Sequence, residues 1–201
     1  MVSALWLVLA LAAWGLVHSL LASLGAKALA RRLFGPGVER VYRLAYNAFA
    51  AFSLLPIGWL LLVLPDWPIY ALPMPWAYSF RLVQLLALVA LGIGLLQTGA
   101  LSFLGLSQIW RPEPAASGLM TAGLYRFVRH PLYSAGLALL WFSPSMTADR
   151  LALTTAATFY LLIGAWFEER KLRREFGEAY ARYASVTPML IPFTRRNKFS
   201  A

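Results

Sequence analysis

Long, almost uncharged stretches of apolar residues alternate with short basic segments along the chain. Residues 1–24 contain no charged side chain, and two further apolar stretches cover about residues 42–64 and 80–104. Because a membrane-spanning helix needs roughly 20 apolar residues, each stretch predicts one span. The first stretch lacks the basic beginning of a cleaved signal peptide, so we expect it to be retained as a helix.

Two shorter apolar stretches, about residues 132–146 and 151–167, follow Pro131. At 1.5 Å per residue the first is about 22 Å long, whereas the hydrocarbon core of a bilayer is about 30 Å thick. The pair therefore predicts a tight helical hairpin, and the sequence leaves open whether it crosses the bilayer fully. Asp149 lies where the N-cap of the returning helix is expected.

Residues 168–184 predict a helix that leaves the membrane. Gly177 weakens its middle, so one bent helix and two helices both remain open. The predicted fold class is an all-α integral membrane protein with about five transmembrane helices, the last two a short helical hairpin, plus a cytoplasmic C-terminal helix. The predicted domains are residues 1–167, a transmembrane helical domain that includes a cytoplasmic loop 105–131, and residues 168–201, the cytoplasmic C-terminal helix and basic tail.

Composition supports the membrane assignment and suggests an orientation. Hydrophobic residues make up 60% of the chain and charged residues 13%, too little charge for a soluble surface. The 18 Lys and Arg residues outnumber the 8 Asp and Glu residues, and they gather in alternate loops. The positive-inside rule then predicts an outside N-terminus and a cytoplasmic C-terminus, which we expect in a bacterial inner membrane. The sequence leaves the oligomeric state open.

Two classes of function are excluded by the same composition. The basic residues lie in short clusters between apolar stretches, which leaves no soluble basic face for a nucleic acid. The chain has no cysteine, which excludes a disulfide scaffold, thiolate catalysis and cysteine metal sites.

Several polar or small residues lie inside the predicted spans. We expect His18 to pack or to hydrogen-bond within the helix bundle. Tyr46 and Asn47 either line a cavity or hydrogen-bond to a neighbouring helix. Gly92 and Gly94 favour close helix packing, because no strand precedes them as a dinucleotide-binding loop would require.

The densest polar segment, residues 107–133, precedes the predicted hairpin. Pro131 suits the first position of a helix, which places His130 at the N-cap, where the helix N-terminus and Arg129 both favour an anion. A basic loop resting on anionic lipid would explain the arginines. It would not explain the histidine, tyrosines and glycines between them, so we favour a functional site. Its candidate residues are Gln108, Gly123, Tyr125, Arg129, His130 and Tyr133.

Two adjacent acids, Glu168 and Glu169, stand at the end of the final apolar stretch. As ordinary surface acids they would pair with neighbouring basic residues and contribute only about 0.3–0.5 kcal/mol each. A hairpin, however, brings its two ends together. We therefore expect both acids to lie near His130 and Tyr133, forming a polar pocket under an apolar roof.

The sequence GLYRFVRHPLYSAG of residues 123–136 and the sequence EERKLRREFGEAYARY of residues 168–183 together resemble the isoprenylcysteine carboxyl methyltransferase family. That family includes bacterial integral membrane methyltransferases and is similar to phospholipid methyltransferases. The resemblance is strong over about residues 118–192 and rests on RHPxY, a hairpin-length gap, EE and FGxxYxxY. Residues 103–108, FLGLSQ, are more similar to the bacterial branch that includes thiol S-methyltransferases.

This resemblance implies an S-adenosylmethionine-dependent methyltransferase, with the cofactor held between the RHPxY loop and the EE helix end. Carried over by position, the catalytic candidates are Arg129, His130 and Glu168. The cofactor-binding candidates are Gln108, Leu119, Gly123, Tyr125, Arg129, His130, Tyr133, Glu168 and Glu169.

The chemistry of the cofactor is compatible with these residues. Its carboxylate suits Arg129, its ammonium suits a glutamate, and its sulfonium suits an aromatic face. In-line methyl displacement relies on alignment, and we expect no metal. The expected acceptor is a lipophilic or small thiol, carboxylate or amine, reached at the cytoplasmic face of the lipid bilayer.

Three other functions remain open from the sequence. An NADPH-dependent membrane reductase, such as the sterol reductases, has a similar C-terminal region. A non-catalytic haem-binding membrane protein would use His18 and His130. A member of the family that lacks catalysis would serve as an assembly factor.

An aromatic face is predicted on the helix of residues 168–184. Phe176, Tyr180 and Tyr183 are spaced four and three residues apart, which places them on one side. We expect this face to pack against the loop of residues 107–129 and to close the pocket. The alternative is a helix that lies on the lipid surface.

Overall fold

The computed structural model describes residues 2–110 and 118–194. These residues divide into two compact units. Among the described residues, the first unit consists of residues 2–71, 99–110 and 145–157, and the second of residues 72–98, 118–144 and 158–194.

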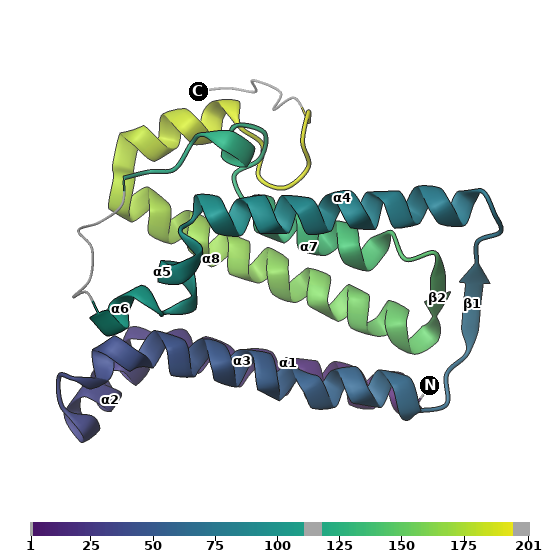
Figure 1. Cartoon of the computed structure of the whole chain (residues 1–201), viewed down its shortest axis with the longest axis horizontal. Coiled ribbons are helices and arrows are strands. Elements are labelled where there is room, and N and C mark those ends of the chain that lie inside the picture. The colour runs from purple at the N-terminus through teal and green to yellow at the C-terminus, as the bar shows by residue number, and fades with distance from the viewer. Residues whose placement is uncertain (1, 111–117, 195–201) are drawn as a thin grey trace. The chain divides into compact units, whose positions relative to one another are not determined.

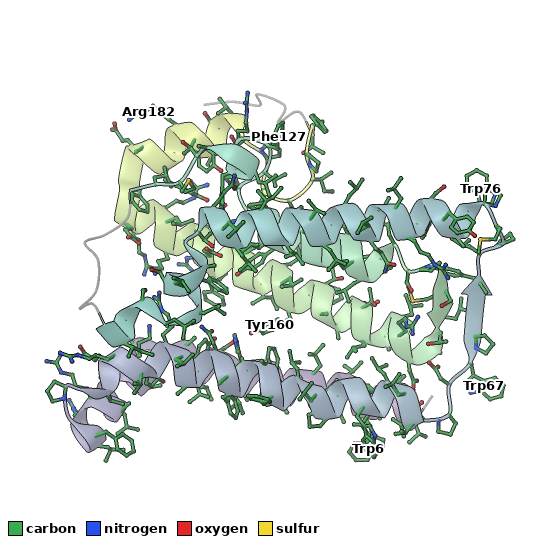
Figure 2. All side chains as sticks on the ribbon, viewed as in Figure 1. Trp6, Trp67, Trp76, Phe127, Tyr160 and Arg182 are labelled. Carbon is green, nitrogen blue, oxygen red and sulfur yellow. The ribbon has the colours of Figure 1, made fainter. Side chains whose placement is uncertain are left out.

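The first unit is built on the packing of helix α1 (Val2–Ala22) against α3 (Val38–Val63), which lie together in Figure 1. Leu7, Leu11 and Ile57 form the buried core of this pair. The remaining large apolar side chains of both helices point mostly outward, as Trp6 does in Figure 2. Outward apolar faces are what helices surrounded by lipid require.

Polar side chains connect the helices of the first unit. The Tyr46 hydroxyl lies 2.6 Å from His18 Nε2, and the His18 ring stacks on Trp14 with 4.7 Å between ring centroids. Asn47 Nδ2 donates a hydrogen bond of 2.8 Å to the carbonyl oxygen of Phe103. The expected hydrogen-bonding role of His18 is therefore confirmed, and Tyr46 and Asn47 take the hydrogen-bonding alternative.

Three short helices depart from the predicted pattern, two of them in predicted loops and one at the end of the third predicted span. Ser23 begins α2 (Leu24–Phe34) by accepting a hydrogen bond of 3.2 Å from Ala26 N. Gly99, with a φ of 76°, precedes α5 (Ala100–Leu104), and α6 (Ser107–Trp110) follows. The third apolar stretch is therefore divided near Gly99 instead of continuing to residue 104.

A small antiparallel sheet is also present, which the all-α prediction did not include. Strand β1 (Pro68–Ala71) pairs with β2 (Ser145–Thr147), and Tyr70 lies opposite Met146. Such a pair leaves little sequence signal, because each strand has four residues or fewer.

Asp149 is not the N-cap of α8 (Ala148–Val186), so that prediction was wrong. The helix begins one residue earlier, and Asp66 Oδ1 accepts the hydrogen bond of 3.0 Å from Asp149 N. The Asp149 side chain turns inward, where its Oδ1 accepts a hydrogen bond of 2.7 Å from Ser3 Oγ. Its Oδ2 is buried and has no hydrogen-bond partner among the described residues.

The second unit contains α4 (Trp76–Gln97) and α7 (Pro131–Trp141), which pack along each other (Figure 1). Gly94 permits this close approach, because a Cβ at that position would lie only 2.7 Å from Leu132 Cδ2. The packing role expected for the glycines of this span is thus confirmed at Gly94. Trp76, labelled in Figure 2, is exposed at the start of α4.

Four described helices are long and apolar enough to cross a membrane, namely α1, α3, α4 and α8. Helix α7 has 11 residues, which corresponds to about 16 Å and is too short for a bilayer. An all-α membrane protein therefore agrees with the described residues, with four candidate spans where about five were expected. The predicted hairpin is an unequal pair of a short α7 and a long α8.

Helix α8 continues beyond its apolar part and bends at Gly177, where φ is 50° and ψ is −124° (Figure 1). Residues 168–184 are thus not a separate element. They are the polar continuation of α8, divided by a kink at the glycine that was expected to weaken them.

Candidate functional site

His130 is the N-cap of α7 and Pro131 is its first residue, as the sequence predicts. The loop before this helix is held by the segment that follows α8. Arg129 N donates to Pro188 O at 2.9 Å, and His130 N donates to Met189 O at 3.1 Å. The backbone around His130 is therefore fixed by residues far along the chain.

A buried ion pair joins the same loop to α8. Arg129 Nε donates to Glu169 Oε1 at 2.7 Å and Nη2 donates to Oε2 at 3.0 Å, a bidentate geometry that gives strong hydrogen bonds. Nη1 donates to the carbonyl oxygens of Ala184, at 3.1 Å, and Thr187, at 2.6 Å. The guanidinium thus links the loop to both parts of α8.

Glu169 has two further hydrogen-bond partners, His130 and Tyr180. His130 Nε2 lies 2.9 Å from Glu169 Oε1, and the fully buried Tyr180 donates its hydroxyl hydrogen bond to the same oxygen. In a straight helix the 11 positions from Glu169 to Tyr180 would span about 16 Å, too far for these side chains to meet. The kink at Gly177 therefore brings Tyr180 back to Glu169.

Glu168 faces the other nitrogen of His130. Its Oε2 lies 3.5 Å from His130 Nδ1, and its carboxylate also accepts a hydrogen bond from Tyr133. The Tyr133 ring stacks on His130 with 5.4 Å between ring centroids. The Glu168 side chain is 45% exposed and that of Glu169 is 9% exposed. Of the two acids, Glu168 is the one that is open to a ligand.

The electrostatics of the cluster are dominated by these carboxylates. Burial lowers the pKa of His130, but the hydrogen bonds and charges of Glu168 and Glu169 outweigh burial and hold that pKa above its usual value. Burial raises the pKa of Tyr125, and the charge on Glu168 raises it further. A cationic group of a ligand would therefore be attracted to the exposed side of Glu168.

The structure brings together five of the predicted site residues: Arg129, His130, Tyr133, Glu168 and Glu169. They come from the loop before α7, the first turn of α7 and the point where α8 becomes polar. Within residues 2–110 and 118–194, no three histidine or acidic side chains are grouped so that they could hold a metal ion.

Tyr125 and Gly123 belong to the short helix η1 (Gly123–Arg126), and of these two it is Tyr125 that the charge of Glu168 affects. The carbonyl oxygen of Tyr125 accepts a hydrogen bond of 2.6 Å from the Tyr183 hydroxyl, so the aromatic face of α8 contacts the loop at this residue. Gly123 has a φ of 61°, and a Cβ there would overlap the Gln97 side chain.

The other two predicted residues are not part of this cluster. Leu119 is half-buried in the segment before η1. Gln108 belongs to the first unit, where its Nε2 donates a hydrogen bond of 3.2 Å to Ser102 O. Part of the predicted cofactor loop, residues 111–117, lies outside the described residues.

Sequence reasoning missed two contributions to the site. The spacing predicts Tyr180 on an aromatic face, but its hydrogen bond to Glu169 depends on the angle of the kink at Gly177. The carbonyl oxygens of Pro188 and Met189 have no signal in the sequence, because every residue carries one. The motif spacing could have suggested Tyr180, whereas nothing in the sequence indicates the backbone contacts.

The comparisons with known proteins point to a single activity. Several relatives carry the name methanethiol S-methyltransferase. The one from Mycobacterium tuberculosis is 32% identical over 189 residues, which is 90% of this chain and 74% of that protein. The one from Pseudomonas sp. is 35% identical over 155 residues, 73% of this chain and 57% of that protein. The one from Pseudomonas deceptionensis is 40% identical over 85 residues, 42% of this chain and 32% of that protein.

The chain thus spans between about a third and three quarters of the length of these curated relatives. No family model and no solved structure matches it. The match to the mycobacterial protein extends over nearly the whole chain, including Arg129 and His130 before α7 and the two acids of α8. It confirms the resemblance that the RHPxY and EE segments suggested. The chain therefore belongs to the methanethiol S-methyltransferase family, which is part of the isoprenylcysteine carboxyl methyltransferase-like membrane methyltransferases.

Proposed function

We propose that this chain is an S-adenosylmethionine-dependent methyltransferase that methylates a small thiol at the cytoplasmic face of a bacterial inner membrane. The observation that carries the proposal is the 32% identity, over 90% of the chain, to a protein named methanethiol S-methyltransferase. The basic loops support a site at the cytoplasmic face, because loops rich in lysine and arginine stay on that side of the membrane. A cytoplasmic site also gives access to S-adenosylmethionine, which is made in the cytosol. The reductase and haem-binding alternatives gain no support from the relatives.

The charged cluster fits the groups of S-adenosylmethionine. The half-exposed carboxylate of Glu168 suits the ammonium group, since charge-assisted hydrogen bonds are the strong ones. The Tyr133 and Tyr125 rings lie close to this carboxylate and suit a sulfonium. The N-terminus of α7 suits the carboxylate of the amino acid part.

Arg129 and Glu169 have a different role in this proposal from the one that the family resemblance implies. Each is bound to the other in a buried bidentate pair, so neither side chain is free to hold a cofactor. We assign them as positioning residues. They fix His130 between the two acids, and His130 in turn orients Glu168.

When bound, S-adenosylmethionine supplies a methyl group that is activated by its positive sulfur. The contribution of the chain is to hold donor and acceptor in line and to exclude water. A small thiol is an apolar molecule that dissolves in the bilayer. The apolar helices around the polar cluster therefore give it a route that a charged acceptor would lack.

Two measurements test the proposal on the purified full chain. Calorimetric titration with S-adenosylmethionine measures cofactor binding. Gas chromatography then measures dimethyl sulfide formed from methanethiol, alongside assays with a prenylcysteine and with phosphatidylethanolamine. Glu168→Gln should weaken cofactor binding about ten- to a hundredfold, because a hydrogen bond to a charged group contributes roughly 1.5–3 kcal/mol.

Glu178→Gln is the matched control on the same helix. Glu178 is 94% exposed and pairs with Arg182 at 3.5 Å, away from the cluster. The affinity of the Glu178→Gln variant for S-adenosylmethionine should therefore equal that of the unmodified chain. Failure of the unmodified chain to bind S-adenosylmethionine would contradict the enzyme class. Binding with methylation of the amine or carboxylate acceptor alone would contradict the thiol.

A further inference from the structure

A surface groove runs along α8 just beyond its apolar part. It is lined by Phe167, Arg170, Lys171, Arg174 and Glu175. These positions are separated by three, one, three and one residues, so they lie on one face of the helix. Neither His130 nor Glu168 lines this groove, so its lining differs from that of the proposed methyl transfer site, although the charge of Lys171 acts on the neighbouring Glu168.

The groove has more positive than negative charge in its lining. Its lining contains three basic residues and one acid. Other arginines of α8 have acidic partners one turn earlier: Arg173 lies 4.0 Å from Glu169, and Arg182 lies 3.5 Å from Glu178. In the described part of the chain, none of the three basic groove residues has a carboxylate within 4.0 Å.

Aromatic side chains border the basic residues on the apolar side. The Arg170 guanidinium lies over the Trp166 ring, 4.6 Å from its centroid. Trp166 contacts Phe167 edge-on, and both rings are more than half exposed. Tryptophan is enriched at the boundary between hydrocarbon and headgroups, and the long stems of arginine and lysine let their charges reach that boundary.

We propose that this groove binds the headgroup of an anionic phospholipid. Arg170, Lys171 and Arg174 would contact the negatively charged phosphate, and Phe167 would contact the start of the acyl chains. Two features favour this occupant over an acidic protein. The groove begins where a candidate membrane span loses its apolar character, and its basic residues adjoin exposed aromatic rings.

Native mass spectrometry of the detergent-purified full chain tests the proposal, with short-chain phosphatidylglycerol and phosphatidylcholine as probes. The unmodified chain should bind phosphatidylglycerol more tightly. The triple variant Arg170→Gln, Lys171→Gln, Arg174→Gln should lose on the order of a hundredfold in that affinity, because each basic residue near an anionic surface contributes roughly fivefold. Arg174→Gln alone should lose about fivefold and provides the readout if the triple variant does not fold.

A charge-matched variant in α2, with Lys27, Arg31 and Arg32 all changed to Gln, removes the same number of positive charges elsewhere. It should retain most of the phosphatidylglycerol affinity. Equal loss in both triple variants would overturn the proposal, because binding would then depend on net charge alone. Equal affinity for the two lipids would overturn it as well, and so would full displacement by inorganic phosphate at concentrations similar to those of the lipid.

Discussion

Among the described residues each unit buries one carboxylate, Glu169 or Asp149, and the two have very different surroundings. In the second unit, Glu169 accepts hydrogen bonds from Arg129, His130 and Tyr180 on its two oxygens. In the first unit, Asp149 is 2% exposed, receives one hydrogen bond from the neutral Ser3 and leaves Oδ2 without a partner in the described residues. Similar burial therefore accompanies very different pairing.

The difference shows which buried acid organises its surroundings. An ionised carboxylate is costly to bury unless cations and hydrogen bonds compensate it. Around Glu169 the compensation comes from the loop before α7, which carries Arg129 and His130, and from the part of α8 beyond the kink, which carries Tyr180, so the acid determines where these segments meet. Around Asp149 the backbone is organised by Asp66 instead, whose carboxylate accepts the hydrogen bond at the start of α8.

The largest expected effect comes from the same isosteric change at both acids. Glu169→Gln leaves the Arg129 charge buried without its partner, which should lower the free energy of unfolding by about 3–5 kcal/mol. Asp149→Asn keeps an oxygen for Ser3 and removes a poorly compensated buried oxygen, so we expect a change within about 1 kcal/mol. Denaturant unfolding of the detergent-solubilised variants measures both.

A double variant sharpens this result. Arg129→Met with Glu169→Met replaces both charges by apolar groups, and such replacements are often close to neutral. It should recover more than half of the stability that Glu169→Gln loses. If Asp149→Asn proved as damaging as Glu169→Gln, the contrast between the two buried acids would be wrong.

An intermediate effect is expected at the kink that brings Tyr180 to Glu169. Gly177 has a φ of 50° and a ψ of −124°, a conformation that side chains disfavour, although a Cβ there would meet no atom within 4 Å. Gly177→Ala should therefore lower the free energy of unfolding by about 1–3 kcal/mol through backbone strain alone, as measured by thermal unfolding.

Gly136→Ala in α7 is the matched control, because its Cβ would also meet nothing within 4 Å and its φ is not positive. In a regular helix this change is neutral or stabilising by up to about 1 kcal/mol. Equal stability of the two alanine variants would show that Tyr180 can reach Glu169 without the strained glycine.

The smallest expected effect is a pH dependence of stability that arises from His130, which contacts Glu169. The neighbouring acids hold the pKa of His130 above its usual value. A raised folded-state pKa gives stability that is fully present below the unfolded value, about 6.5, and is lost as pH rises through the folded value. The melting temperature should therefore fall as pH increases above about 6.5.

Glu168→Gln should flatten this pH profile, because it removes one of the two charges that raise the His130 pKa. Asp149→Asn should leave the profile unchanged, since Asp149 belongs to the first unit. Parallel profiles for Glu168→Gln and the unmodified chain would mean that another group titrates.

The sequence predicts the meeting of Arg129, His130, Glu168 and Glu169, because a hairpin brings its ends together whatever its exact length. It also predicts His130 as the N-cap of α7, since Pro131 is restricted to the first turn. It does not separate the roles of Glu168 and Glu169. Neighbouring helix positions differ by about 100° in direction, and only the packing decides which acid turns inward.

Other features depend on contacts that no local pattern records. Asp66, whose carboxylate accepts the hydrogen bond from Asp149 N at the start of α8, is 83 positions away from Asp149 in the sequence. Many other residues could have supplied such an acceptor. Ser23 as the cap of α2 is a local signal, yet the uncharged residues around it favour an uninterrupted first span. The unpredicted β1–β2 pair likewise depends on two short segments that are far apart in the chain.

The attachment of the His130 loop to the segment after α8 has a consequence for synthesis. Arg129 and Thr187 are 58 positions apart, which a ribosome takes roughly 3–12 seconds to translate. During that interval α7 is synthesised, while the carbonyl acceptors of the guanidinium have not yet been made. The charged cluster is therefore the last part of the second unit to mature in a nascent chain, after its helices have entered the membrane.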